Sequence, residues 1–256
     1  MLSDTEINEF HTTGWFCLPA LFDSEEVEQM RRCFDGLEHA AAELRESGLH
    51  DGAMFVLDQK ASEQIIKRVV WAGASQPYLL QIGADPRLTV PASQLLESAE
   101  MEQLLNQAHF KRPGDGVVFG WHQDIQHRDK GNGTWTDANG KGSFVQTLIA
   151  IDEMNGDSGP LMFVPGSCAW GPIDFGQQSY EDPDQRRELP SPYRDSEIVT
   201  VTAQPGDVLF FGPYTAHASF ENRSSEYRRV LINGYAYPGA NNRNYPGDGA
   251  GRLLRV

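Results

Sequence analysis

Residues 117–124 read Val-Val-Phe-Gly-Trp-His-Gln-Asp, a short β-rich run that ends in a histidine and a carboxylate one residue apart. In an extended backbone, side chains at positions i and i+2 point to the same face. His122 and Asp124 can therefore reach one metal ion while Gln123 faces away. A His-x-Asp triplet also occurs by chance in many proteins, so a metal site needs a third ligand elsewhere in the chain.

His217 is the best candidate for that third ligand. It follows a Pro-Gly-Asp turn and the apolar run 208–211, which predicts a strand that delivers it near one end. Two imidazoles and one carboxylate suit a non-haem Fe(II) and leave coordination positions open. The same three groups also make a catalytic zinc site, so zinc is the alternative ion.

Arg228, downstream of His217, adds a cation to this set. A guanidinium can hold a carboxylate through two parallel hydrogen bonds. A cosubstrate such as 2-oxoglutarate needs such an anchor, because its keto-acid end chelates the metal and its distal carboxylate meets a cation. Ser219 could add a hydroxyl to that carboxylate. On the pattern alone, Arg228 could equally be a surface charge like its neighbours Arg223 and Arg229.

The predicted secondary structure changes from mainly helical to mainly β near residue 106. Before it, apolar spacing and capping residues predict helices at about 4–10, 23–45, 62–72 and 88–106, and a strand at 15–18. After it, short β-rich runs alternate with Gly, Pro, Asp and Asn clusters and predict strands at 107–111, 117–121, 144–151, 161–164, 198–201, 208–211, 216–220 and 229–235.

Eight short strands with such turns are typical of a β-sandwich or barrel of jelly-roll type, and we expect the helical N-terminal third to pack against its outside. A chain of 256 residues suits one large domain, so we expect residues 1–256 to form a single domain. Residues 176–196 are predicted to be a long surface loop, and residues 237–251 an irregular tail.

Charge and composition limit the function classes. The net charge of −15 argues against nucleic acid or an anionic membrane as a partner, but it says little about a small-molecule substrate, whose pocket could be locally basic. No apolar run approaches the roughly 20 residues needed to cross a bilayer, and the N-terminus lacks the pattern of a secretory signal. Three cysteines without a CxxC pair predict a reducing compartment, so we expect a cytoplasmic protein. The oligomeric state is left open.

Further motifs accompany these residues. They are 10–15 (Phe-His-Thr-Thr-Gly-Trp), the helix start at 23–27, 111–114 (Lys-Arg-Pro-Gly), 158–167 (Ser-Gly-Pro-Leu-Met-Phe-Val-Pro-Gly-Ser) and 206–207 (Gly-Asp). Together with 121–124, 217–219 and Arg228, they resemble the phytanoyl-CoA dioxygenase family of Fe(II)- and 2-oxoglutarate-dependent oxygenases. The likeness covers about residues 5–236.

The resemblance implies a mainly β fold with flanking helices, namely a double-stranded β-helix (a cupin-like jelly roll). It implies that His122, Asp124 and His217 bind Fe(II). It also implies that Arg228 and Ser219 hold the distal carboxylate of 2-oxoglutarate.

Further positions bear on the same comparison. Phe119 and His109 match cosubstrate-contacting positions of the ectoine hydroxylase branch, which has Asn at the second of them. The family usually has His where this chain has Cys168, but that position is not an iron ligand. Related halogenases lack the carboxylate that Asp124 supplies, so hydroxylation is favoured over halogenation.

The implied reaction couples O2 and the breakdown of 2-oxoglutarate, to succinate and CO2, to hydroxylation of an unactivated C–H bond. The expected substrate is a small polar metabolite such as an aminophosphonate, an amino acid or a compatible solute. The alternatives are a non-catalytic metal-binding β-barrel and a zinc hydrolase.

Five side chains are candidates for contact with that substrate. Gln107 and Gln146 lie on predicted neighbouring strands and could face one cavity. His127 and Arg128, with Trp135 beyond them, follow the metal motif and could present a positive rim to an anion. A solvated loop is the alternative for this second group.

Overall fold

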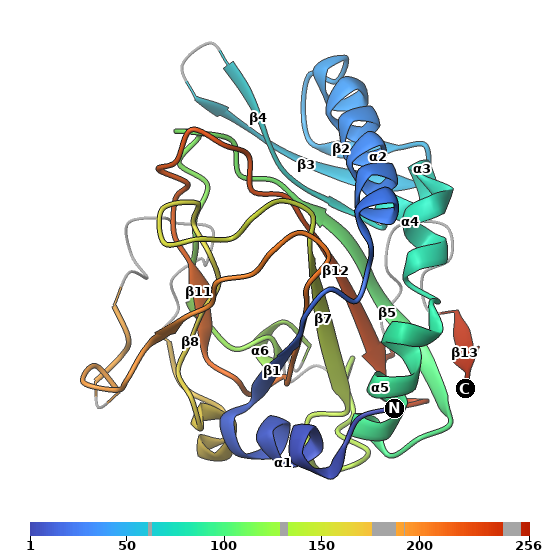
Figure 1. Ribbon diagram of the computed structural model, residues 1–256, viewed down its shortest axis with the longest axis vertical. Helices are drawn as coiled ribbons and strands as arrows, with labels where there is room; N and C mark the ends of the chain where they lie inside the picture. The colour runs from blue at the N-terminus through green and yellow to red at the C-terminus, as the bar shows by residue number, and fades with distance from the viewer. Residues whose placement is uncertain (61–62, 129–132, 176–187, 192, 243–251) are drawn as a thin grey trace.

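The computed structural model describes residues 1–60, 63–128, 133–175, 188–191, 193–242 and 252–256 (Figure 1). In chain order, its elements are α1 (Asp4–Thr13), β1 (Trp15–Leu18), α2 (Ser24–Ala42), β2 (Gly48–His50), β3 (Ala53–Lys60), β4 (Glu63–Val70), α3 (Ala72–Ser75), α4 (Pro77–Ile82), α5 (Pro86–Leu96), β5 (Glu100–His109), β6 (Phe119–His122), α6 (Ile125–Arg128), β7 (Phe144–Ala150), β8 (Met162–Phe163), the 3-10 helix η1 (Ser167–Trp170), β9 (Val199–Thr200), β10 (Val208–Phe211), β11 (His217–Ser219), β12 (Val230–Ala236) and β13 (Leu253–Arg255).

These strands form two antiparallel sheets that face each other. The larger sheet has the order β1-β10-β7-β12-β5-β4-β3-β2, with β13 added to β5, and the smaller sheet has the order β6-β11-β8-β9. Figure 1 shows α2, α4 and α5 along the larger sheet, on the side away from β8 and β11. The mainly β sandwich with outer helices agrees with the jelly-roll architecture predicted from the sequence.

Strand β10 shows how the larger sheet separates two cores. Val208 and Phe210 join the core under the helices, whereas Leu209 and Phe211 join the core between the sheets. Alternate side chains of a strand point to opposite faces, so a strand covered on both faces must be apolar throughout. The apolar run 208–211 is therefore a central strand that two layers bury.

The first two helices begin within one residue of the predicted starts and end within three residues of the predicted ends. The carboxylate of Asp23 accepts hydrogen bonds from the backbone N–H groups of Glu25 and Glu26, and the Glu26 side chain closes a capping box at the start of α2. Helix α1 ends at Gly14, whose φ of 94° is left-handed and suits glycine. The predicted strand at 15–18 is β1, so this part of the prediction is confirmed.

The helix predicted at 62–72 is wrong, because residues 63–70 form strand β4. The apolar pairs Ile65-Ile66 and Val69-Val70 are four residues apart, which fits both a helix and a buried strand. β-Branched side chains favour the strand, where the restricted rotation about χ1 costs less.

The helix predicted at 88–106 is correct only in its first half. Helix α5 ends before Glu97, which adopts a left-handed φ of 55° although it is not a glycine, and β5 begins at Glu100. The predicted strand at 107–111 is the end of this longer strand. From residue 117 onward, the seven other predicted strands match β6 to β12 within three residues at each end.

The sequence patterns did not predict the hairpin of β2 and β3. Its turn is Asp51-Gly52, and both residues have positive φ (46° and 75°). An Asp-Gly pair between short strands is the usual signal for such a turn. The N-terminal third is therefore helical only in part, and β2, β3 and β4 extend the larger sheet.

Most of the predicted loop 176–196 and residues 243–251 of the predicted tail lie outside the described residues. No helix in the described part of the chain is both long enough and apolar enough to span a membrane.

The turn Gly206-Asp207 fixes the start of β10. The carbonyl of Gly206 accepts backbone hydrogen bonds from Leu21 and Phe22, and the Asp207 carboxylate accepts one from the backbone N–H of Ala20 at 2.7 Å. Gly206 has a φ of 93°, and a Cβ at this position would overlap the carbonyl oxygen of Phe22. This contact ties the N-terminal segment to the strand that leads toward His217.

Gly206→Ala is expected to lower the free energy of unfolding by at least about 2 kcal/mol, from left-handed strain of roughly 1–2 kcal/mol and overpacking of about 1–3 kcal/mol. Urea denaturation measures the change. Gly48→Ala is the matched control, because a Cβ at Gly48 meets no atom within 4 Å. Equal stability of the two variants would show that the close approach to Phe22 does not constrain residue 206.

Candidate metal centre

Pairing of β6 with β11 brings the two histidines together. Their register places His217 directly opposite His122, and the ring centroids are 4.2 Å apart. Both side chains are buried, at 6% and 4% exposure. Directly opposed residues of antiparallel strands have neighbouring Cβ atoms, so the ring contact follows from the register.

Asp124 joins this pair from the turn that follows β6. One carboxylate oxygen lies 3.7 Å from Nε2 of His122, and the other lies 3.4 Å from Nε2 of His217. Gln146 on β7 donates a short hydrogen bond from its side-chain amide to the same carboxylate. The predicted convergence of these three distant side chains is therefore present.

Backbone carbonyls orient both imidazoles. Nδ1 of His122 lies 2.6 Å from the carbonyl oxygen of Gly120, and Nδ1 of His217 lies 2.9 Å from that of Thr215. A carbonyl oxygen can accept a hydrogen bond but cannot donate one, so each Nδ1 must carry the N–H. Each Nε2 therefore presents its lone pair toward Asp124. Two lone pairs beside a carboxylate repel unless a cation lies between them, so this donor set fits a divalent metal ion.

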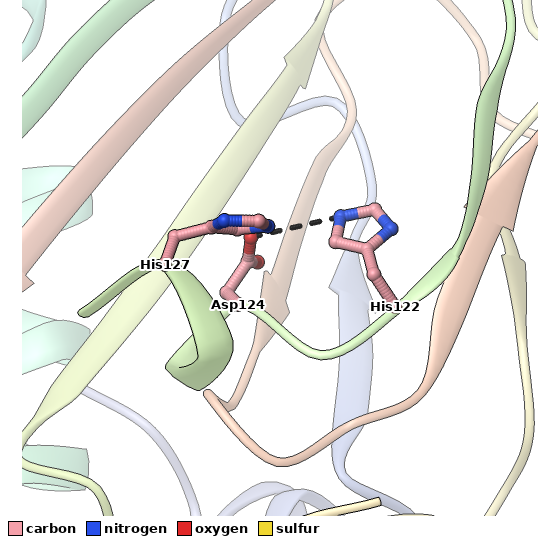
Figure 2. Close-up of side chains that lie close together, drawn as sticks. All are labelled: His122, Asp124 and His127. Carbon is pink, nitrogen blue, oxygen red and sulfur yellow. Dashed lines mark ion pairs between the residues drawn. The ribbon is translucent and has the colours of Figure 1, made fainter. Parts of the chain in front are cut away.

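A third imidazole lies beside the same carboxylate. Ligand atoms of His122, Asp124 and His127 all lie within 4.8 Å of one another, and Figure 2 shows Asp124 between the two rings. His127 belongs to α6, which starts directly after Asp124. The sequence placed His127 only with the substrate, whereas the structure brings it to the metal cluster as well.

Gln123 faces away from the cluster, as predicted, and its side chain forms hydrogen bonds that stabilise the turn between β6 and α6. Its amide nitrogen donates to the carbonyl oxygens of Gly171 at 3.0 Å and Tyr214 at 2.6 Å, and its side-chain oxygen accepts the backbone N–H of Ile173 at 2.8 Å. This one side chain joins the segment before α6 to two loops.

Arg228 is buried at the end of the site away from Asp124. Its guanidinium, 3% exposed, donates twice to the carbonyl oxygen of Gly159, and one nitrogen lies 3.4 Å from the Ser219 hydroxyl. Burial lowers the pKa of Arg228 to about 10, so it stays charged at neutral pH. Among the described residues Asp115 and Asp152 raise its pKa through their charge but form no ion pair with it, and a buried cation of this kind favours an incoming anion.

Lys111 supports this end of the site and was not singled out from the sequence. Its ammonium donates to the carbonyl oxygen and the hydroxyl of Ser219 at 2.8 and 2.9 Å, and to the carbonyl oxygen of Phe220. Burial, and next the charge of Arg228, lower the pKa of Lys111. The three contacts hold the amine against Ser219 and Phe220, so Lys111 fixes the position of the Ser219 hydroxyl.

One cavity of about 380 Å³ connects the metal cluster to Arg228. The predicted site residues that line it are Gln107, His109, Phe119, His122, Asp124, His127, Arg128, Gln146, His217, Ser219 and Arg228. The sequence missed one further cation, Arg68, because it lies in the stretch predicted to be a helix. In strand β4, Arg68 and Val70 are two residues apart and share the face that lines the cavity.

Trp135 is a wrong prediction, since it does not line this cavity. Its ring is 7% exposed and packs edge to face against Phe144 at 5.4 Å. Its indole N–H donates to the carbonyl oxygen of Gly142 at 3.2 Å. A large side chain with its polar atom satisfied is part of the core, where it packs with Leu104 and Ile125.

His109 lines the cavity between the cations. Its ring lies 5.0 Å from Phe119, and its Nε2 lies 3.1 Å from the side-chain oxygen of Gln107. Burial, followed by the charges of Arg68 and Arg228, lowers the pKa of His109 well below the usual value. His109 is therefore neutral and can both donate and accept a hydrogen bond.

A jelly-roll sandwich that carries a buried histidine–carboxylate cluster is the architecture of a mononuclear metal-dependent oxygenase. Residues 10–230 match the family described as phytanoyl-CoA dioxygenase (PhyH). The chain belongs to this family, so it is an oxygenase, and the predicted use of iron and 2-oxoglutarate is confirmed at the level of the family.

Curated relatives include a dioxygenase and a hydroxylase. The ectoine dioxygenase of Bordetella parapertussis is 27% identical over 241 residues, which cover 87% of this chain and 71% of the relative. The methylphosphonate hydroxylase of Gimesia maris is 23% identical over 232 residues, which cover 90% and 79%.

Solved structures confirm the double-stranded β-helix fold. The crystal structure of EctD from S. alaskensis with bound Fe has a TM-score of 0.71 at 20% identity and covers 93% of this chain and 78% of that one. The epimerase SnoN, in complex with Fe3+, alpha ketoglutarate and nogalamycin RO, has a TM-score of 0.70 at 18% identity and covers 95% and 93%.

Arg228→Gln is expected to raise the KM for 2-oxoglutarate about 10- to 150-fold, since a hydrogen bond to a charged group contributes about 1.5–3 kcal/mol. Succinate formation at varied 2-oxoglutarate measures the change. The control is Arg223→Gln, which alters a guanidinium on an exposed side chain paired with Glu221. An unchanged KM in Arg228→Gln would remove this residue from the anchor.

Proposed function

We propose that this protein is a hydroxylase that acts on a small anionic metabolite, with Fe(II) held by His122, Asp124 and His217. Arg228 and Ser219 would bind the distal carboxylate of 2-oxoglutarate. The convergence of two Nε2 atoms on one carboxylate, in a cavity that ends at a buried guanidinium, is the observation that carries this proposal.

Iron in this site would supply the oxidising chemistry, coupling the breakdown of 2-oxoglutarate with O2 to hydroxylation of the substrate. The protein groups bind and orient the reactants. Gln146 holds the Asp124 carboxylate, and the carbonyls of Gly120 and Thr215 keep both imidazoles in the ligating tautomer. None of these side chains needs to act as a general base.

Apolar side chains exclude water from the same cavity. Val70, Leu148, Leu161, Phe211 and Val230 line it beside the polar groups. This apolar lining strengthens the attraction between Arg228 and a carboxylate, because the effective dielectric constant in the cavity is lower than in water.

The charges that line the cavity indicate an anionic substrate. Arg68, Arg128 and Arg228 contribute three cations, and Asp124 is the one carboxylate among the described lining residues. This balance is opposite to that of the whole chain, which carries −15. One relative is a methylphosphonate hydroxylase, so a phosphonate or a carboxylate is the chemistry that we propose.

The two rival functions are less well supported. A zinc hydrolase needs an acid–base carboxylate beside the metal, and the described lining residues offer none besides Asp124, which is a proposed ligand. A non-catalytic metal-binding barrel does not account for a buried Arg228 at the far end of the cavity, because metal binding alone requires no cation there.

We also propose that residues 1–256 act as a single oxygenase domain and that the protein works in a reducing cytoplasm. Cys17, Cys33 and Cys168 are all free thiols, which supports the compartment.

Anaerobic addition of Fe(II) and 2-oxoglutarate is expected to produce the weak visible charge-transfer band of a chelated keto acid, and admission of air should then yield succinate. Asp124→Ala is expected to abolish succinate formation at limiting Fe(II), because the site loses the one carboxylate among its described lining residues. Glu46→Ala, an exposed loop carboxylate, is the control. Zinc-dependent hydrolysis without succinate would contradict the proposal.

Arg128→Gln is expected to raise the KM for a phosphonate or carboxylate substrate about 10- to 150-fold, the loss that one charged hydrogen bond predicts. The KM for 2-oxoglutarate should stay constant. Arg68→Gln is a second variant, because Arg68 is only half-buried whereas Arg128 is buried. Equal turnover of an uncharged analogue by the wild type would contradict the anionic class.

A further inference from the structure

We propose that His127 is a fourth protein ligand of the metal before the cosubstrate binds, and that 2-oxoglutarate displaces it. The inference rests on the proposed function, because it concerns the same iron site. It adds a third imidazole to a centre whose other protein donors are His122, Asp124 and His217.

The position of α6 directs His127 toward the ion. The helix begins at the residue after Asp124, and the backbone N–H of His127 donates to the carbonyl oxygen of Asp124 at 3.0 Å. This single turn brings the side chain at i+3 back beside the carboxylate. The His127 ring lies 5.8 Å from the ring of His122, and His127 lines the cavity that holds the cluster (Figure 2).

Distances show that His127 is close enough to coordinate after a small shift. Nitrogen and oxygen ligands lie about 2.0–2.2 Å from an ion of this size, so two donors of one ion are at most about 4.4 Å apart. The Asp124 contacts to His122 and His217, at 3.7 and 3.4 Å, fall inside this limit. Ligand atoms of His122, Asp124 and His127 lie within 4.8 Å of one another, and neighbouring ligands of one ion are about 3 Å apart, so a shift of at most roughly 2 Å brings His127 to the ion.

His127 is also the donor that can most easily leave. The pairing of β6 with β11 fixes His122 and His217, and backbone carbonyls hold their Nδ1 atoms. His127 instead lies on a helix of four residues and is only half-buried. Since 2-oxoglutarate and oxygen need the positions that a facial triad leaves open, His127 and the cosubstrate compete for one of them.

Pulsed EPR of the full chain loaded with Cu(II) counts the coordinated imidazoles. We expect three in the wild type without 2-oxoglutarate and two with it, but two under both conditions in His127→Phe. His217→Ala is the comparison variant. It should lose one imidazole under both conditions, because His217 is a permanent ligand.

Affinity measurements provide a second readout. Without 2-oxoglutarate, His127→Phe should bind Fe(II) at least about 5-fold more weakly under anaerobic conditions. The metal-loaded variant should then bind 2-oxoglutarate more tightly by the same factor, because the coupling between two ligands is reciprocal. Thermal unfolding of His127→Phe checks that the variant folds.

Two imidazoles in the wild type without cosubstrate, together with unchanged Fe(II) affinity in His127→Phe, would overturn the fourth ligand. Three imidazoles that persist after 2-oxoglutarate binds would overturn the displacement. Both results leave the iron site intact, whereas failure of the proposed function would appear as a wild type with no coordinated imidazole and no charge-transfer band.

Discussion

The antiparallel pairing of β6 and β11 is the constraint on which the rest of the site depends. It sets His122 opposite His217 and, across an irregularity that shifts the register by one residue, Phe119 opposite Ser219, so this one pairing positions both the metal end and the cosubstrate end of the cavity. A slip of one residue would turn every side chain of one strand to the other face. The Gln123 amide and the two backbone carbonyls at Nδ1 then only refine positions that the register has already set.

The far end of the cavity shows how a fold can hold buried positive charge. The Arg228 guanidinium donates to two neutral oxygens, the carbonyl oxygen of Gly159 and the hydroxyl of Ser219. Neutral acceptors satisfy the hydrogen bonds of a cation without cancelling its charge. The positive potential therefore remains available to attract the carboxylate of a ligand. An internal Asp or Glu partner would have neutralised that potential.

Local sequence patterns predicted the metal cluster and the jelly roll because strand alternation and turn residues act over a few positions. They failed at 62–72, where the spacing of β-branched pairs fits two periods, and so Arg68 was missed. Trp135 was wrongly assigned to the substrate, since only its packing on Phe144 shows that it belongs to the core. The approach of His127 to Asp124 likewise depends on a helix of one turn, which is too short for a periodic signal.

The contrast between an acidic chain and a cation-lined cavity has a consequence for how anions arrive. At low ionic strength, the field of the −15 protein extends tens of ångströms and opposes a dicarboxylate before it senses Arg228. Near 0.15 M salt the Debye length falls to about 8 Å, so the repulsion from distant acidic groups is screened. The attraction to the guanidinium groups inside the pocket is screened much less. We therefore expect the cosubstrate to associate faster in physiological salt than in dilute buffer, the reverse of ordinary electrostatic steering.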